Sequence, residues 1–114
     1  MDKDMLNNAK KVFVIQLAKK NQFVITYVSN DKEYWAFQSY RTLIAIYCPS
    51  TKEMLINWSK FDYSKTTTKH TKLFINTYTC YTYNDKKDFI ALIKNNNLID
   101  TFWKVKMTKN ILWY

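Results

Sequence analysis

Apolar and polar side chains alternate through the first half of the chain, and a period of two is the pattern of β-strands. In the segment KVFVIQLA (11–18), Phe13, Ile15 and Leu17 fall on one face. The wider stretch 9–20 also fits a helical period, so strand and helix both remain open there. Further strands are predicted at 22–28, 33–39, 42–48 and 53–59.

The last two of these strands differ in how their faces are covered. Segment 42–48 is apolar on both faces, which is typical of a central strand buried from both sides. Segment 53–59 alternates, which indicates one covered and one open face. Its predicted inward side chains are Met54, Ile56 and Trp58, and its predicted outward ones are Glu53 and Asn57.

Turns between these segments have to form without glycine, because the chain contains none. Asn, Asp and Ser are the residues that best tolerate or initiate the tight backbone that glycine usually supplies. Turns are therefore predicted where such residues gather, at 19–22, 29–32, 48–53 and 83–87.

A helical period begins after residue 60. Ser64 is a natural N-cap, and a helix is predicted over 64–77. Placing successive residues about 100° apart gives an inward and an outward stripe. The inward stripe is His70, Leu73, Phe74 and Thr77, and the outward one, called here the lysine stripe, is Lys65, Lys69, Lys72 and Asn76. A second helix is predicted at 85–96, capped by Asp85, with Phe89, Ile90 and Ile93 inward.

Two segments complete the expected fold. TYTCYTY (77–83) has strong strand propensity and is interpreted either as an extra strand or as an extended connection. The C-terminal part alternates around Trp103, Val105 and Met107 and predicts a last strand. The 114 residues suit one domain. The prediction is a single α+β domain over 1–114, with an antiparallel sheet of four to six strands and two helices packed on it.

Charge is the strongest compositional signal. The formal net charge is +9, from 18 basic and 9 acidic residues, and Arg41 is the single arginine. Such an excess attracts polyanions, and the attraction weakens with salt. The absence of glycine and the many Asn and Lys residues are also biases of an AT-rich genome. Codon pressure is therefore a rival source of part of the lysine excess.

The sequence gives no sign of a membrane segment or of a leader. No run approaches 18 consecutive apolar residues, which excludes a conventional membrane-spanning helix. The first eleven residues, MDKDMLNNAKK, carry acids and lack the apolar core of a signal peptide. The expected location is the cytoplasm of a host cell, with no membrane partner.

Candidate catalytic chemistry is sparse. His70 is the only histidine and falls on the inward stripe, where a packing role is favoured over general-base catalysis. Cys48 and Cys80 lack the paired spacing of a metal site or a disulfide framework. No carboxylate pair stands out. The protein is therefore expected not to be an enzyme, and neither a metal nor a cofactor is predicted.

Binding is the remaining class of function. The candidate residues for a partner or nucleic acid are the lysine stripe and its basic neighbours: Lys60, Lys65, Lys69, Lys72, Asn76, Lys104, Lys106 and Lys109. Exposed aromatic rings among them would stack on single-stranded bases. The competing interpretation is that the stripe is a solvated helix face and that most aromatics belong to the core.

FQSYRTLIAIY (37–47) and NWSKFDYSKTTTKHTKLFI (57–75) together resemble small uncharacterised proteins of phages and mobile elements. The matching residues are Phe37, Gln38, Ser39, Tyr40, Ile44, Ala45, Tyr63, Ser64, Thr66, Thr67, Lys69 and Phe74. The resemblance covers about half the chain, roughly 22–75. It implies accessory genes whose neighbours include anti-defence proteins such as anti-CRISPRs, and it carries no assigned activity.

These observations lead to a non-enzymatic phage or mobile-element protein that inhibits a host defence ribonucleoprotein or nuclease complex. Inhibition is expected through its nucleic-acid channel or an adjacent protein surface. The alternative is a stand-alone DNA- or RNA-binding accessory or regulatory protein of the element. A third option is an assembly component that associates through exposed aromatic side chains.

Overall fold

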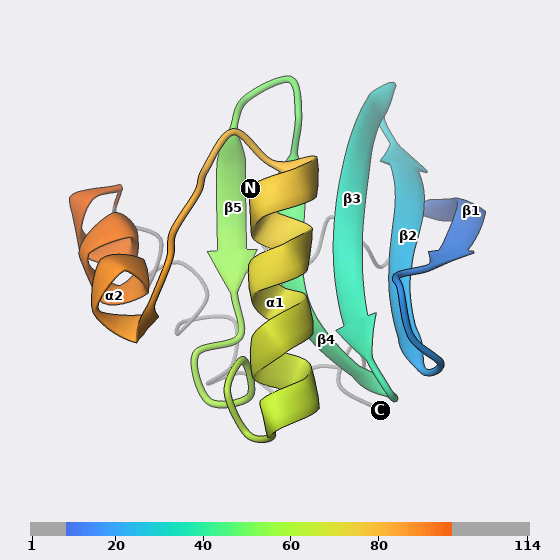
Figure 1. The fold of residues 1–114 in the computed structure, drawn as a ribbon. Helices are drawn as coiled ribbons and strands as arrows, with labels where there is room; N and C mark the ends of the chain where they lie inside the picture. Colours follow the sequence, from blue (N-terminus) through green and yellow to red (C-terminus); the bar gives the residue numbers. More distant parts are fainter. Residues whose placement is uncertain (1–8, 97–114) are drawn as a thin grey trace.

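Five strands form one antiparallel sheet in which each strand pairs with its neighbours in the sequence. The computed structural model describes residues 9–96 (Figure 1). The strands are β1 (Lys10–Gln16), β2 (Gln22–Ser29), β3 (Lys32–Ser39), β4 (Thr42–Cys48) and β5 (Glu53–Ile56), in the order β1-β2-β3-β4-β5. The number of strands lies within the predicted four to six, and the stretch left open between strand and helix is a strand.

Two helices follow the sheet, which confirms the predicted α+β class. Helix α1 (Lys65–Tyr78) lies on one face of the sheet and runs along the strands, and α2 (Lys86–Asn95) lies beside β5 (Figure 1). Each begins at the predicted cap. Ser64 Oγ accepts a hydrogen bond from the Thr67 amide, and the Asp85 carboxylate accepts one from the Asp88 amide. These bonds satisfy amides that have no partner within the helix.

Positive φ angles occur without glycine. The two-residue link between β2 and β3 has φ of 51° at Asn30 and 63° at Asp31, as type I′ hairpin turns require. Asn21 lies in the predicted turn 19–22 and has a φ of 68°. Tyr40, between β3 and β4, has a φ of 57° although neither it nor Arg41 is a turn-forming type. That turn was not predicted.

The core lies between α1 and the middle of the sheet. All β4 side chains from Leu43 to Cys48 are buried, as predicted for a central strand. Phe74 of α1 stacks on Phe37 of β3 with ring centroids 5.7 Å apart. Tyr78 meets Trp35 edge-on at 6.4 Å. Large aromatic pairs of this kind orient a helix as well as bury area, because their rings prefer a few mutual geometries.

The C-terminal end of β5 differs from the prediction. Asn57 was predicted to point outward, which is wrong: it is 4% exposed and Nδ2 donates to the Leu43 carbonyl at 3.0 Å. The ladder of β5 ends at Ile56, and the Asn57 amide donates to Ile44 O at 2.7 Å. The chain turns away at this point, so a buried amide side chain completes the hydrogen bonding of β4.

The buried stripe of α1 also differs from the prediction. His70 and Phe74 are buried as predicted, but Thr77 is exposed and Leu73 is only half-buried. Thr67, Thr71 and Ile75 are buried instead. Threonine is accepted on this face because its hydroxyl finds partners there: Thr71 Oγ1 donates to the carbonyls of Thr67 and Phe61.

The segment 77–83 is not a strand. Helix α1 continues to Tyr78, and the following residues form the extended connection that was the alternative. The strand predicted around Trp103, Val105 and Met107 lies outside the described residues. Between residues 9 and 96, neither helix has the length and apolarity needed to cross a membrane.

Candidate nucleic-acid interface

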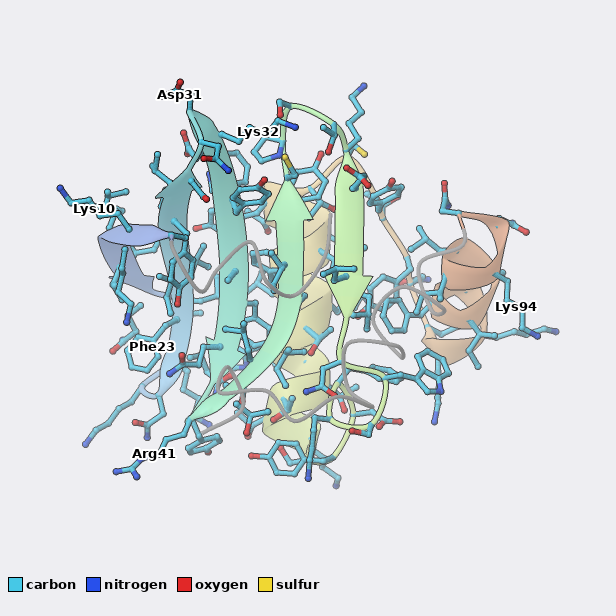
Figure 2. All side chains as sticks on the ribbon, turned by 180° about the vertical axis from the view of Figure 1, so that it is seen from behind. Lys10, Phe23, Asp31, Lys32, Arg41 and Lys94 are labelled. Carbon is cyan, nitrogen blue, oxygen red and sulfur yellow. The ribbon has the colours of Figure 1, made fainter. Side chains whose placement is uncertain are left out.

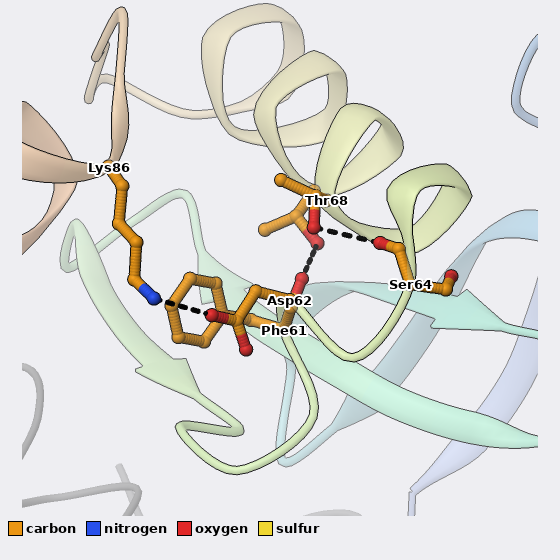
Figure 3. Close-up of polar contacts among 6 residues, drawn as sticks. Phe61, Asp62, Ser64, Thr68 and Lys86 are labelled. Carbon is orange, nitrogen blue, oxygen red and sulfur yellow. Dashed lines mark hydrogen bonds and ion pairs between the residues drawn. The ribbon is translucent and has the colours of Figure 1, made fainter.

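Three hydroxyl groups hold the start of α1 against the end of β3. Ser39 and Thr67 are fully buried, and their side-chain oxygens lie 2.9 Å apart. Ser64 Oγ donates to the same Thr67 oxygen at 3.0 Å. The Thr68 hydroxyl donates to the Ser64 carbonyl at 2.8 Å (Figure 3). The N-terminus of α1 is thereby placed at the end of the sheet where β3 turns into β4.

The loop 57–63 is held at the same end by both helices. Its Phe61 carbonyl accepts from Thr71 of α1 at 3.1 Å, and the Phe61 ring lies 4.8 Å from that of Phe89 in α2. Asp62 pairs with Lys86 at 2.9 Å (Figure 3). These contacts leave Lys60 and Tyr63 on the outside of the loop, where both are exposed.

The turn 18–21 and the β3–β4 hairpin meet beside them. The Tyr40 amide donates to the Asn21 carbonyl at 2.6 Å, which joins the two turns directly. Gln38 Nε2 donates to the Tyr40 carbonyl at 2.8 Å. Lys19, Lys20 and Arg41 are exposed around this contact. Three separate loops and a helix N-terminus therefore converge on one end of the molecule.

Five exposed cations lie at this end of the molecule, which is called here the basic end. They are Lys19, Lys20, Arg41, Lys60 and Lys65. Within residues 9–96, no carboxylate forms an ion pair with any of the five; Asp62, the nearest in sequence, is taken by Lys86. The first turn of α1 contains no acid. The positive end of the helix dipole therefore adds to the side-chain charge.

Acidic side chains of the sheet lie at its other end. Asp31 is in the β2–β3 turn, Glu33 is the second residue of β3, and Glu53 begins β5. Figure 2 shows Arg41 at one end of the strands and Asp31 with Lys32 at the opposite end. The asymmetry gives the protein one end that attracts anions over a distance of about a Debye length, roughly 8 Å at physiological salt.

The predicted lysine stripe is divided by the structure. Lys65 and Lys69 are exposed, so they remain candidates for binding. Lys72 is half-buried and its Nζ donates to Asn84 Oδ1 at 3.3 Å. Asn76 bonds both backbone groups of Tyr83 at 3.0 Å, as donor to the carbonyl and acceptor from the amide. The last two residues hold the connection between the helices.

The other predicted candidates are Lys60 and three lysines of the C-terminal part of the sequence. Lys60 belongs to the basic end, with Nζ 6.0 Å from the centroid of the Tyr63 ring. Lys104, Lys106 and Lys109 lie outside the described residues. Sequence reasoning missed Lys19, Lys20 and Arg41. Only the turn signal at 19–22 pointed toward them. Pairing of β2 with β3 brings the two turns together, and the Ser39–Thr67 contact brings the start of α1 to them.

The remaining reactive side chains are packed into the core or lie away from the basic end. His70 is 3% exposed, and its Nδ1 lies 2.8 Å from the Thr66 carbonyl. Cys48 is buried and Cys80 exposed, and both are free thiols. In the described part of the chain, no three His, Cys, Asp or Glu side chains gather as metal ligands would.

Perturbed pKa values in this structure come mainly from burial. Burial raises the pKa of Tyr47 to about 12, and a contact with Cys80 adds to the effect. Burial also raises the pKa of Tyr83. Burial opposes ionisation of Cys48, but hydrogen bonds from Ser50 and Thr51 leave its pKa below the usual value. Tyr47 and Cys48 are neighbours in β4, whereas Tyr83 lies in the connection between the helices.

The architecture and its charged end define a small basic α+β protein. The chain belongs to a family of unknown function, DUF8033, whose model matches residues 3–91. That match includes all five strands, α1 and every residue of the basic end, and it extends beyond both ends of segment 22–75. No curated protein matches the chain, and no solved structure matches it.

Proposed function

We propose that this protein is a non-enzymatic nucleic-acid-binding protein of a phage or other mobile element, which inhibits a host defence ribonucleoprotein by contacting its RNA or DNA. The observation that carries the proposal is the basic end. Five exposed cations and the N-terminus of α1 lie at one end of the molecule, and no carboxylate within residues 9–96 forms an ion pair with any of the five. The phage context rests on the sequence resemblance.

The net charge of the protein favours one of two ways of blocking such a complex. Nucleic-acid channels of RNA-guided effectors are themselves positively charged. A chain with a formal charge of +9 is repelled by an empty channel of that kind. The same charge is attracted to the guide RNA, to a displaced DNA strand or to the target. Contact with the nucleic acid of the complex is therefore favoured over occupation of its channel.

A stand-alone role for the element itself is the second candidate. The same basic end would bind regulatory DNA or RNA with no host protein, because phosphate contacts are independent of sequence. This candidate predicts tight binding to free nucleic acid. The inhibitor predicts weaker binding to the free polymer and stronger retention on the assembled complex.

Two variants with equal net charge test the site. Arg41→Glu, Lys60→Glu and Lys65→Glu reverse three cations of the basic end. Lys10→Glu, Lys32→Glu and Lys94→Glu reverse three exposed lysines elsewhere (Figure 2). Each reversal replaces a positive charge with a negative one and lowers the net charge by two, so both triples lower the formal charge from +9 by six, to +3. The two triples, the basic-end triple and the control triple, therefore have the same net charge and differ only in where on the protein the charges are reversed.

Affinity for labelled single-stranded RNA, single-stranded DNA and duplex DNA is measured at two salt concentrations. The basic-end triple is expected to lose at least about tenfold in affinity and to flatten the log–log salt slope by about 2–3, one phosphate contact per residue. The control triple is expected to change affinity much less. Equal losses in both triples would contradict a localised interface.

The host context needs its own assay. The protein is expressed in cells with an active nuclease defence, and phage survival and co-purifying complexes are compared between wild type and the two triples. Protection that the control keeps and the basic-end triple loses would support inhibition. Tight nucleic-acid binding with no protection and no retained complex would leave the stand-alone regulator.

A further inference from the structure

Tyr40 occupies a backbone conformation that its side chain disfavours. Its φ is 57°, in the left-handed region where a bulky residue is a genuine outlier. Both of its peptide groups are held, the amide by Asn21 O at 2.6 Å and the carbonyl by Gln38 Nε2 at 2.8 Å. Strain of this kind persists where the surrounding structure overdetermines it, and it concentrates at functional sites.

Burial of the Tyr40 ring in the core does not offset this strain. The residue is 45% exposed, and Arg41 beside it is exposed too. Asn in this position would adopt the same φ at lower cost, as the neighbouring Asn21 does at 68°. Folding alone would therefore favour another residue here. An exposed aromatic ring in a strained hairpin calls for a reason outside the fold.

A second exposed ring lies at the same end. Tyr63 is 51% exposed, and the Lys60 ammonium lies 6.0 Å from its centroid. The hydroxyls of Ser39 and Ser64, the residues adjoining Tyr40 and Tyr63, both bond to Thr67 Oγ1, at 2.9 and 3.0 Å. Thr67 thus ties the residues next to Tyr40 and Tyr63 to one buried oxygen, so the hairpin and the loop before α1 are held together at this point.

We infer that Tyr40 and Tyr63 form a stacking platform for unpaired bases, so that the basic end selects single-stranded over double-stranded nucleic acid. This inference rests on the proposed function and names its ligand. Bases of a single strand can splay out onto aromatic rings, whereas bases of a duplex are already stacked on one another. Lys19, Lys20, Arg41, Lys60 and Lys65 would follow the phosphates of that strand.

The test separates stacking from charge. Tyr40→Asn and Tyr63→Ala, made singly and together, remove the rings without changing net charge. Tyr63→Phe keeps the ring as a matched control. Phe13→Thr removes a ring that is 60% exposed on β1, outside the basic end. Anisotropy titrations use labelled oligothymidylate and a duplex of equal length, and thermal melts report folding.

The double ring variant is expected to lose about tenfold or more in affinity for oligothymidylate, since one stacked base accounts for about five- to 150-fold. Its duplex affinity is expected to stay unchanged, as are all affinities of Tyr63→Phe and Phe13→Thr. Tyr40→Asn is expected to melt at a higher temperature than wild type, which separates its binding loss from unfolding.

Three results would overturn the inference. The wild type could bind strand and duplex equally, the ring variants could lose both equally, or Phe13→Thr could lose as much as the double variant. The first two leave the basic end as a general polyanion site and so leave the proposed function intact. A wild type that binds no nucleic acid, free or within a defence complex, would overturn both.

Discussion

The side-chain oxygens of Ser39 and Thr67 lie 2.9 Å apart in a fully buried contact that joins β3 to the first turn of α1. It brings together two stretches that are separate in the sequence, 37–47 and 57–75. A buried hydroxyl costs little folding free energy only while its hydrogen-bond partner is present. The contact therefore sets the position of α1 along the sheet.

Thr67→Val tests that contact, because it removes the hydroxyl at almost constant volume. The free energy of unfolding is expected to fall by about 1–3 kcal/mol, since Ser39 loses its buried partner. Ser39→Ala alone should also destabilise, and the double variant should cost less than the sum of the two. Denaturant unfolding of all four proteins measures the coupling. Strict additivity would show that the two hydroxyls do not depend on each other.

Gln22 offers a stabilising change. The residue is fully buried, and neither Nε2 nor Oε1 has a hydrogen-bond partner within the described structure. A buried amide without partners costs about 1–3 kcal/mol. Gln22→Met keeps the length and approximate volume of the side chain, so the melting temperature is expected to rise. A lower melting temperature would mean that the amide is satisfied in solution.

Asn76 is expected to act on stability rather than on binding. Its two hydrogen bonds to Tyr83 at 3.0 Å hold the connection between the helices. Asn76→Ala should therefore lower the free energy of unfolding by about 1–3 kcal/mol, at about 0.5–1.5 kcal/mol per hydrogen bond. Nucleic-acid affinity of the folded variant should equal that of wild type. A selective loss of affinity, with stability unchanged, would restore Asn76 to the binding surface predicted from the sequence.

Lys65→Glu should move stability and binding in opposite directions. Lys65 is the first residue of α1, where a cation opposes the helix dipole. Glutamate there is expected to stabilise the helix by about 0.3–1 kcal/mol while weakening attraction for phosphates. Lys94→Glu, in the last turn of α2, is the matched control and should destabilise slightly with affinity little changed. A Lys65→Glu variant that binds normally would remove this residue from the interface.

Alkaline pH should destabilise the protein through Tyr47. Burial, followed by the contact with Cys80, raises its pKa to about 12, whereas the phenol of an unfolded chain has a pKa of about 10. The folded state therefore holds a proton that the unfolded state loses over this range. Its contribution to stability is fully present below pH ~10 and is lost as pH rises toward ~12.

Denaturant unfolding between neutral pH and pH ~12 measures this effect. Tyr47→Phe should make the free energy of unfolding decline less steeply with pH. Part of the decline should remain in this variant, because burial also raises the pKa of Tyr83. A decline of equal steepness in wild type and Tyr47→Phe would exclude Tyr47 as a source of the pH dependence.

Local features were readable from the sequence because the groups that form them are close along the chain. Ser64 caps α1 through an amide three residues away, and Asp85 does the same for α2. Asn30 and Asp31 make the β2–β3 turn through their own backbone preferences. The doubly apolar β4 follows from the burial of both of its faces. These features determine the elements and the α+β class.

Tertiary structure alone decided where the charges and rings meet. Lys19 and Arg41 come within one surface because β2 pairs with β3 in the register Gln22↔Ser39, which brings their flanking turns together. Periodicity could not show that Asn76 and Lys72 form hydrogen bonds to the connection between the two helices. Nor could it place Tyr40 in a left-handed turn. Such roles depend on partners distant in sequence, whose positions exist only once the sheet has paired and α1 has docked on it.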